Sequence, residues 1–214
     1  MRIRAETIIP AKKKTPVLCA FCFEDTNVPI GLERLDKKID QTILESVREN
    51  KGKKNSIAII HSHKELPSEK ILIAGIGKKN QITSDVIRDV VGNVTKKINE
   101  LGIKEFSIIV PEKILNDNDQ VISSIVEGAN LSLYHFDLFK KEKYNKKESD
   151  LTLLTSNDKS QKIIKNSIII SDAVKFTRDV ANLPPNECPP MKLGEIAKKI
   201  ASQNKMKCTI FSKN

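Results

Sequence analysis

Two cysteines near the start of the chain have a spacing that could bind a metal. Cys19 and Cys22 form a C-x-x-C pair, which is typical of metal and redox sites. They lie in the apolar run 17–23, which predicts a buried strand, and strand residues three apart point to opposite faces. We therefore favour buried structural thiols, with a metal or redox pair as the alternative. Cys188 and Cys208 lie far along the chain.

The histidines offer a second candidate for metal binding. His61 and His63 flank one serine at the end of a predicted strand, so both imidazoles could share one face, a geometry that metal sites use. No motif places an Asp, Glu or Cys ligand beside them, so we favour exposed or loop-bound histidines over a metal site. His135, in the apolar run 133–136, is predicted to be a half-buried residue in or at the end of a helix.

A glycine pair follows a predicted strand and could contact a phosphate. The segment from Ile71 reads Ile-Leu-Ile-Ala-Gly-Ile-Gly-Lys, and a strand that ends in G-x-G is typical of nucleotide-binding turns. The third glycine of that motif would be residue 80, which is Asn80. The next helix is also predicted to begin several residues late. We favour a tight turn over a phosphate site, and we assign no catalytic, metal-binding or cofactor-binding residue within the chain.

The elements that surround these residues alternate between strands and helices. Three amphipathic helices are predicted: Leu32 to Val47, Val86 to Leu101 after a cap at Thr83 or Ser84, and Val121 to Leu133 after a cap at Asp119. This alternation indicates an α/β domain with helices flanking the sheet. Because the first two strands have no helix between them, part of the sheet should be antiparallel, which makes it mixed. The predicted strands are 3–9, 17–23, 56–62, 70–75, 105–110 and 151–155.

The end of the chain predicts a long helix, a proline-rich joint and the start of a second unit. The helix runs from about Asp158 to Asn182, and Pro184 and Pro185 cannot continue it. A further helix over residues 191–200 and a strand over residues 206–210 should follow. This last unit is shorter than the roughly 40 residues that usually fold alone.

We therefore expect three parts along the chain. Residues 1–157 form an amino-terminal α/β domain, 158–183 a linker helix, and 184–214 the truncated start of a second α/β domain. The 206–210 strand would lack sheet neighbours, so the segment from Met191 to Phe211 should be frayed or self-associating in the isolated chain.

Composition limits the classes of partner. The chain has 214 residues, 39% of them hydrophobic, and a net charge of +10. The excess is mostly Lys, densest at 140–147, with Tyr144 the only aromatic residue in that run. Because few arginines are available for bidentate phosphate contacts and no aromatic residues are placed to stack on bases, we favour lysines exposed to solvent on loops. DNA binding is the less favoured alternative. No apolar run reaches the length of a membrane span, and the first ten residues lack the apolar block of a signal peptide, so a cytoplasmic protein is expected.

Three segments together resemble a known family. Ile71 to Lys79 reads ILIAGIGKK, Glu127 to Asp137 reads EGANLSLYHFD, and Arg178 to Glu187 reads RDVANLPPNE. In order and spacing they are similar to the amino-terminal half of the leucyl aminopeptidase family (peptidase family M17). The last segment is the most specific, and the resemblance covers nearly the whole chain.

The resemblance implies a two-domain enzyme that hydrolyses peptides and releases amino-terminal, leucine-like residues. It implies a macro-domain-like amino-terminal fold, a linker helix, and a carboxy-terminal catalytic domain with two divalent metals, zinc or manganese. It also implies a hexamer assembled through the catalytic halves. Two metals would polarise the scissile carbonyl and supply a hydroxide at neutral pH.

The sequence departs from this family where catalysis would occur. The family signature Asn-Thr-Asp-Ala-Glu-Gly-Arg is absent, as is the glycine-rich segment with lysine and aspartate that precedes it. No catalytic or metal-binding residue is therefore carried over. Arg178, Asp179 and Asn182 match the family's joint, and we give them a structural role in ending the helix and docking two domains.

The leading hypothesis is the amino-terminal, non-catalytic portion of a metalloaminopeptidase, inactive by itself and serving positioning and assembly. The alternative is a macro-like module that binds DNA or a nucleotide-type ligand.

Overall fold

The computed structural model describes residues 1–24, 26, 28–32, 52–62, 66–112, 114–141 and 149–211. Outside the described residues lie positions 33–47 of the helix predicted from Leu32 to Val47, His63 and most of the Lys-rich run 140–147. The chain divides into two compact units, Met1–Asp172 and Ala173–Asn214, and each is described by itself.

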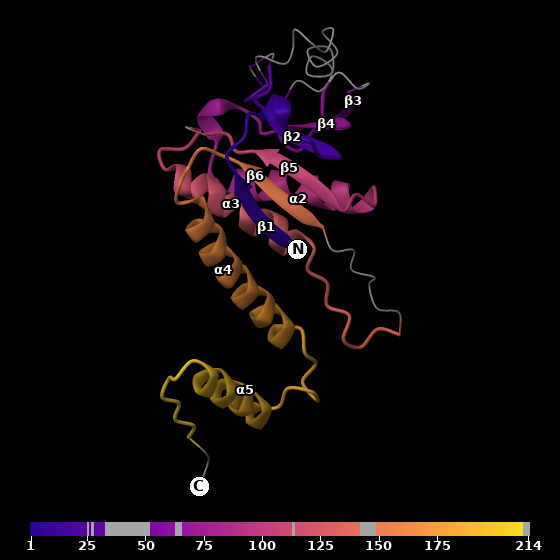
Figure 1. Ribbon diagram of the computed structural model, residues 1–214. Helices are drawn as coiled ribbons and strands as arrows, with labels where there is room; N and C mark the ends of the chain where they lie inside the picture. Colours follow the sequence, from indigo (N-terminus) through magenta and orange to yellow (C-terminus); the bar gives the residue numbers. More distant parts are fainter. Residues whose placement is uncertain are drawn as a thin grey trace. The chain divides into compact units, whose positions relative to one another are not determined.

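The first unit is built on a six-stranded mixed sheet (Figure 1). The order across the sheet is β1-β6-β5-β2-β4-β3. All neighbouring pairs are parallel except β3 with β4, which is antiparallel. The strands are β1 (Arg2–Glu6), β2 (Val17–Cys22), β3 (Ile57–His61), β4 (Lys70–Gly75), β5 (Glu105–Ile109) and β6 (Asp150–Leu154).

The predicted α/β class and mixed sheet are confirmed, but the reason given for the antiparallel pair is wrong. β1 and β2 are not neighbours, because β6 and β5 lie between them. The connection contains a short 3₁₀ helix, η1 (Pro10–Lys12), and carries the chain across two strands. The absence of a long helix between two strands therefore did not require a hairpin. The antiparallel partner is β3, which pairs with β4 at one edge of the sheet.

β2 is the central strand, and its sequence shows why it forms there. All six residues of Val-Leu-Cys-Ala-Phe-Cys are buried, and a strand covered on both faces reads as a continuous apolar run. Alternate side chains enter two separate apolar clusters. Val17, Cys19 and Phe21 contribute to one, and Leu18, Ala20 and Cys22 contribute to the other.

Two helices cover the face of the sheet that carries the larger cluster (Figure 1). In α2 (Ser84–Glu100), Thr83 is the N-cap, and its hydroxyl accepts a hydrogen bond from the Val86 amide at 3.3 Å. In α3 (Asn118–Ser132), the N-cap is Asp117, whose carboxylate accepts from the Asp119 amide at 2.8 Å. The predicted cap at Asp119 is therefore wrong by two residues, because either aspartate fits the capping pattern.

α2 and α3 approach closely at two glycines. A Cβ atom on Gly128 would lie 2.4 Å from the Arg88 carbonyl oxygen, whereas a Cβ on Gly92 would lie 3.4 Å from Ser132 Cβ. The smaller of these distances is below any normal separation, so Gly128 permits the α2 main chain to pass over α3.

The long helix predicted near the end is α4 (Ser160–Ala181). Its first half buries Ser160, Ile164, Ser167 and Ser171, while Ile169 and Ile170 are exposed. The buried Ser171 hydroxyl is satisfied within the helix, because it donates to the Ser167 carbonyl at 2.8 Å.

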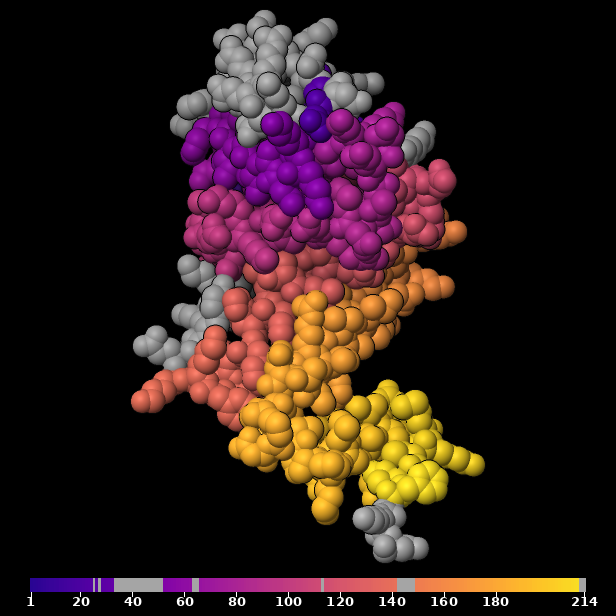
Figure 2. Space-filling view, turned by 180° about the vertical axis from the view of Figure 1, so that it is seen from behind, coloured from indigo at the N-terminus to yellow at the C-terminus, as the bar shows by residue number. Residues whose placement is uncertain are grey.

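In the second unit, α5 (Pro190–Gln203) begins at a proline with Pro189 as its N-cap, as predicted. The strand predicted at 206–210 is wrong. These residues form no strand and are exposed, because a strand requires a sheet neighbour and none pairs with it among the described residues. The segment instead folds back on α5, and together they make up the yellow part of Figure 2. The Met206 amide donates to the Ala201 carbonyl at 2.8 Å, and Ile210 lies beside Gly194.

Candidate functional site

The carboxyl ends of the parallel strands are the first place to search for a ligand site. In open α/β sheets, ligands bind where the strand order reverses, which here is between β2 and β5. That position is filled by apolar side chains. Leu32 is fully buried and packs in one cluster with Ile109. Gly31, with φ of +82°, lies so close that a Cβ would be 2.7 Å from Ile109 Cγ2. The crevice expected for a nucleotide is therefore occupied by protein.

The glycine pair lies at the end of β4, where the predicted tight turn is wrong: no turn is assigned at residues 75–78, and the Ile76 amide donates to the Cys22 carbonyl at 3.0 Å, which continues the pairing with β2. Gly77 has φ of +79°, and a Cβ on Gly75 would lie 2.1 Å from the Lys53 carbonyl oxygen. The Gly77 amide donates to the Gly52 carbonyl, and the Asn55 amide donates to the Gly75 carbonyl, both at 3.0 Å. These glycines therefore allow the backbone of residues 75–77 to contact the turn at residues 52–55. α2 begins only at Ser84, so its N-terminus is separated from these glycines.

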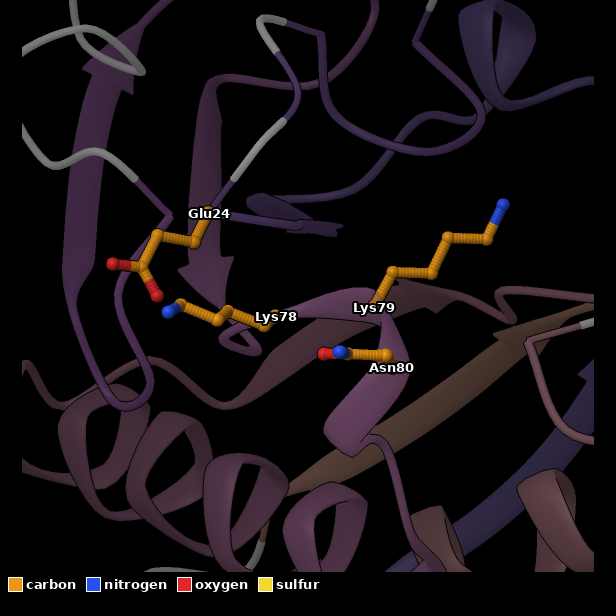
Figure 3. A pocket seen from close by; sticks show the side chains of 4 residues that line it. All are labelled: Glu24, Lys78, Lys79 and Asn80. Atoms are coloured by element: carbon orange, nitrogen blue, oxygen red, sulfur yellow. The ribbon is translucent and has the colours of Figure 1, made fainter.

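A hollow of about 490 Å³ lies just after the glycine pair, lined by Glu24, Lys78, Lys79 and Asn80 (Figure 3). The Lys78 amine and the Glu24 carboxylate point toward one another, whereas the Lys79 side chain extends away from both (Figure 3). The Lys78 and Lys79 amines therefore do not converge on one point, and the Glu24 carboxylate faces the same space as Lys78. An anion would therefore meet both charges, so this hollow is a weak candidate for phosphate binding.

A second hollow, of about 610 Å³, lies at the start of α3 and carries several acidic and amide side chains. Asp117 already accepts from the Asp119 amide, and Asp119 accepts from the Asn157 side-chain amide at 2.9 Å. These carboxylates cap local backbone and hold the loop before α4. Nowhere in the described part of the chain do three or more His, Cys, Asp or Glu residues converge as metal ligands.

A third hollow, of about 350 Å³, lies where β1, β5 and β6 end. It has apolar walls and one carboxylate, Glu112. Glu112 Oε1 accepts from the Ser156 amide at 3.0 Å, the Ser156 hydroxyl at 2.7 Å and the Thr155 hydroxyl at 3.2 Å. Sequence reasoning missed Glu112, although its position just after a predicted strand was a usable signal.

The prediction of buried structural thiols is confirmed for Cys19 and Cys22. Both are fully buried, on opposite faces of β2, so they cannot bind one metal together. Burial raises the pKa of the Cys19 thiol far above its usual value. The Cys22 thiol donates to the Phe23 carbonyl at 3.4 Å.

Among the described residues, His61 and His135 belong to no group of possible metal ligands. His61 is exposed at the end of β3, while His63 lies outside the described residues. His135 is exposed and follows α3, which ends at Ser132. The prediction that His135 is half-buried in or at the end of a helix is therefore wrong, because the apolar run 133–136 continues past the helix as irregular chain.

The proline joint follows α4, which ends at Ala181. The Asn182 amide donates to the Arg178 carbonyl at 2.9 Å, and the Cys188 amide donates to the Pro184 carbonyl at 3.1 Å. The first bond satisfies a carbonyl group in the last turn of α4, whereas the second lies in the joint after the helix. The helix-ending role predicted for Arg178, Asp179 and Asn182 stays a prediction, as does their role in docking two domains.

Comparison with known proteins decides the family. The model of the cytosol aminopeptidase family, N-terminal domain, matches residues 20–143. This chain belongs to the cytosol aminopeptidase family. The resemblance found in the sequence is thereby confirmed, and the chain carries the family's N-terminal domain.

Relatives with this N-terminal domain are longer. A probable cytosol aminopeptidase of Cenarchaeum symbiosum is 37% identical over 213 residues, which are 100% of this chain and 42% of the relative. One from a Sulfurihydrogenibium species is 26% identical over 92% of this chain and 41% of its own length. The chain therefore spans less than half the length of these relatives.

Solved structures share the fold. A mutant of tomato leucine aminopeptidase matches with a TM-score of 0.79 and 17% identity, over 96% of this chain and 43% of that chain. The bottromycin maturation enzyme BotP, solved also in complex with Mn, matches with a TM-score of 0.69 and 13% identity, over 92% of this chain and 38% of that one.

Within the described ranges, no helix has both the length and the apolar character needed to cross a membrane.

Proposed function

We propose that the whole protein is a metal-dependent aminopeptidase that releases amino-terminal residues from peptides in the cytoplasm. Residues 1–214 supply its non-catalytic amino-terminal part. The observation that carries this proposal is the match of the family's N-terminal domain to residues 20–143, together with relatives of which this chain covers only 42%. The catalytic residues and two divalent metals, zinc or manganese, lie in a domain outside residues 1–214.

The proposed division of labour follows the chain. Residues 1–157 form the amino-terminal domain, 158–183 the linker helix, and 184–214 the start of the catalytic domain. Support comes from exposed apolar side chains along α4. Ile169 is 59% exposed, Ile170 54% and Phe176 44%. Residues 169, 173 and 176 fall on one helical face, and monomeric proteins rarely leave large apolar patches uncovered.

The second unit has the same character. Met191 is 83% exposed and Phe211 93%, on a helix followed by an extended segment with no sheet neighbour among the described residues. We propose that the catalytic domain covers these side chains and adds the sheet that residues 206–210 lack. In this account the amino-terminal part positions the catalytic domain and supports assembly into a homo-oligomer, a hexamer by the family resemblance.

The proposal is tested on the whole protein with leucine amide as substrate. Hydrolysis is expected with Mn²⁺ or Zn²⁺ and should disappear when a chelator removes the metal. Replacing Glu112 or Cys19 should leave the reaction chemistry intact, because neither residue belongs to the proposed catalytic site. A metal-independent reaction, or no release of amino-terminal residues from any peptide in a mixed library, would show that the proposal is wrong.

The docking role of α4 has its own test. Phe176→Ser removes apolar surface from the proposed interface, and Thr177→Ser changes a neighbouring exposed residue only slightly. In the whole protein, Phe176→Ser should lower thermal stability and Thr177→Ser should not. Equal stability of both variants would contradict the proposed packing.

A further inference from the structure

One short turn in the first unit carries apolar side chains at positions where turns usually carry polar ones. The Lys140 amide donates to the Asp137 carbonyl at 3.0 Å, so Leu138 and Phe139 are the two central residues of this turn. Such positions are most often occupied by Gly, Pro, Asn, Asp or Ser. Leu138 is nevertheless 61% exposed and Phe139 54%. Two large apolar side chains that add little to the core of the unit point to a contact with something outside it.

The exposed ring of Phe139 is held by a second aromatic residue. The ring centroids of Phe136 and Phe139 lie 6.0 Å apart, with an interplanar angle of 60°, which is within the range of favourable aromatic pairs. Phe136 is itself partly buried, so it ties its neighbour to the unit. Because the apolar tip of the turn is already ordered, less conformational entropy is lost when a partner binds it.

The turn lies at the edge of the sheet where the parallel strands begin. It belongs to the connection from α3, which ends at Ser132, to β6, which begins at Asp150. Both overall views show the described part of this connection projecting from the first unit (Figures 1 and 2). A projecting tip can contact a broad surface without hindrance from the body of the unit.

The charge beside the tip favours one class of surface. Lys140 and Lys141 are both exposed, and the net charge of the chain is +10. Protein–protein interfaces are depleted in lysine. Apolar and aromatic side chains beside lysines are instead typical of segments that lie in the headgroup region of anionic membranes, where each lysine gains from the negative surface potential. Charge complementarity therefore favours an anionic lipid surface over a protein as the partner.

We propose that the turn at residues 137–140, together with Lys141, docks on an anionic lipid surface. Leu138 and Phe139 enter the headgroup region, and Lys140 and Lys141 contact the lipid phosphates. The chain lies on the surface and does not cross the bilayer. Because the apolar anchor is small, the association is weak and reversible, as it is for a single acyl chain. This inference goes beyond the proposed function and does not depend on it.

A tryptophan placed at the tip tests the insertion. The 214-residue sequence contains no tryptophan, so a substituted one reports on a single position. Phe139→Trp keeps an aromatic ring at the tip. Ile9→Trp puts the reporter on another exposed residue, just after β1 at the opposite edge of the sheet. The full chain is titrated with vesicles of phosphatidylcholine, alone or mixed with phosphatidylglycerol. The Phe139→Trp emission should shift to shorter wavelength only with the mixed vesicles, and the Ile9→Trp emission should not shift.

Sedimentation with the mixed vesicles measures the contribution of each side chain to affinity. Phe139→Ser should weaken binding about tenfold, because one apolar side chain no longer leaves water. Replacement of both Lys140 and Lys141 by Gln should weaken binding about 25-fold, which is about fivefold for each lysine.

Matched controls change the same kinds of side chain at the other edge of the sheet. Ile9→Ser removes an exposed apolar side chain, and Lys78→Gln with Lys79→Gln removes an adjacent pair of exposed lysines after β4. Both controls should bind as tightly as the original chain. Equal thermal midpoints check that every variant is folded. The exposed apolar side chains of α4 and the second unit are the same in all variants, so they cannot produce the differences.

Four results would overturn the proposal: no sedimentation with the mixed vesicles, equal binding to both kinds of vesicle, unchanged affinity in Phe139→Ser, or unchanged affinity in the double lysine variant. Binding that depends on the lysines but not on Phe139 would show only a general attraction between a basic protein and an anionic surface. The hydrolysis assay of the whole protein is independent of these measurements, so the two proposals fail separately.

Discussion

The packing of α2 against α3 allows a prediction in which two similar substitutions have opposite effects. Gly128 and Gly92 are both buried in helices that pack against each other. Alanine in place of glycine within a helix contributes about 1 kcal/mol through helix propensity. The two positions differ in the space available for an added Cβ atom. A Cβ at residue 128 would lie 2.4 Å from the Arg88 carbonyl oxygen and 3.0 Å from its Cα, whereas at residue 92 the nearest atom is 3.4 Å away.

The magnitudes follow from these distances. At Gly128 the opposing atoms are main chain, so the helices must separate, and overpacking of this kind costs up to about 3 kcal/mol. After the gain in propensity, Gly128→Ala should lower the free energy of unfolding by about 2 kcal/mol. At Gly92 the separation is ordinary, so Gly92→Ala should raise the free energy of unfolding by up to about 1 kcal/mol.

Urea unfolding monitored by far-ultraviolet circular dichroism measures both effects. The midpoint should fall for Gly128→Ala and stay equal or rise for Gly92→Ala, with unchanged m-values. If both variants are stabilised, or both are destabilised to the same degree, the close approach of α2 to α3 at Gly128 is refuted.

Three further predictions concern other parts of the chain. Because Cys19 is fully buried and its pKa is raised by burial, iodoacetamide should modify Cys208 and Cys188 in the folded chain but spare Cys19. Mass spectrometry of the digested protein measures the modification, and labelling of Cys19 before Cys208 and Cys188 would contradict the prediction. Hydrogen bonds from Lys54 and Asn55 lower the pKa of Asp89 in the folded chain. These bonds therefore stabilise the fold above the pKa that Asp89 has in the unfolded chain, and the stabilisation is lost as pH falls through the lower, folded pKa. At neutral pH, Asp89→Asn should cost about 0.5 kcal/mol, because both partners are half exposed; an equal cost in acid would count against the ion pair. Amide exchange of residues 207–211 should be fast, and protection equal to that of β2 would contradict the absence of a sheet partner.

Most of the fold could be read from the sequence because its strands are short and strongly apolar. The run from Val17 to Phe23 indicated a buried strand, and the period of two placed Cys19 and Cys22 on opposite faces, as observed. The position of β1 could not be predicted, because its partner β6 is almost 150 residues away and pairing at that distance leaves no local signal. At residues 206–210 the local signal is present but the partner is missing. The alternating pattern there indicates a strand, but a strand also requires a neighbour in a sheet.

The hollow beside Glu112 was missed for a related reason. Residues 7–10, 109–112 and 154–156 come from three distant parts of the sequence, and none of the three carries a motif by itself. Only the parallel order β1-β6-β5 brings their carboxyl ends together. The contact of Gly31 and Leu32 with Ile109 likewise joins distant parts of the chain, and the local sequence pattern does not predict it.

The most direct test of the central claim is the rate at which purified residues 1–214 hydrolyse leucine amide in the presence of Mn²⁺ or Zn²⁺. With catalytic and metal-binding residues placed outside this part of the protein, the expected rate equals that of the metal alone. Turnover that increases in proportion to the concentration of the chain, and that persists after removal of contaminating peptidases, would contradict the claim.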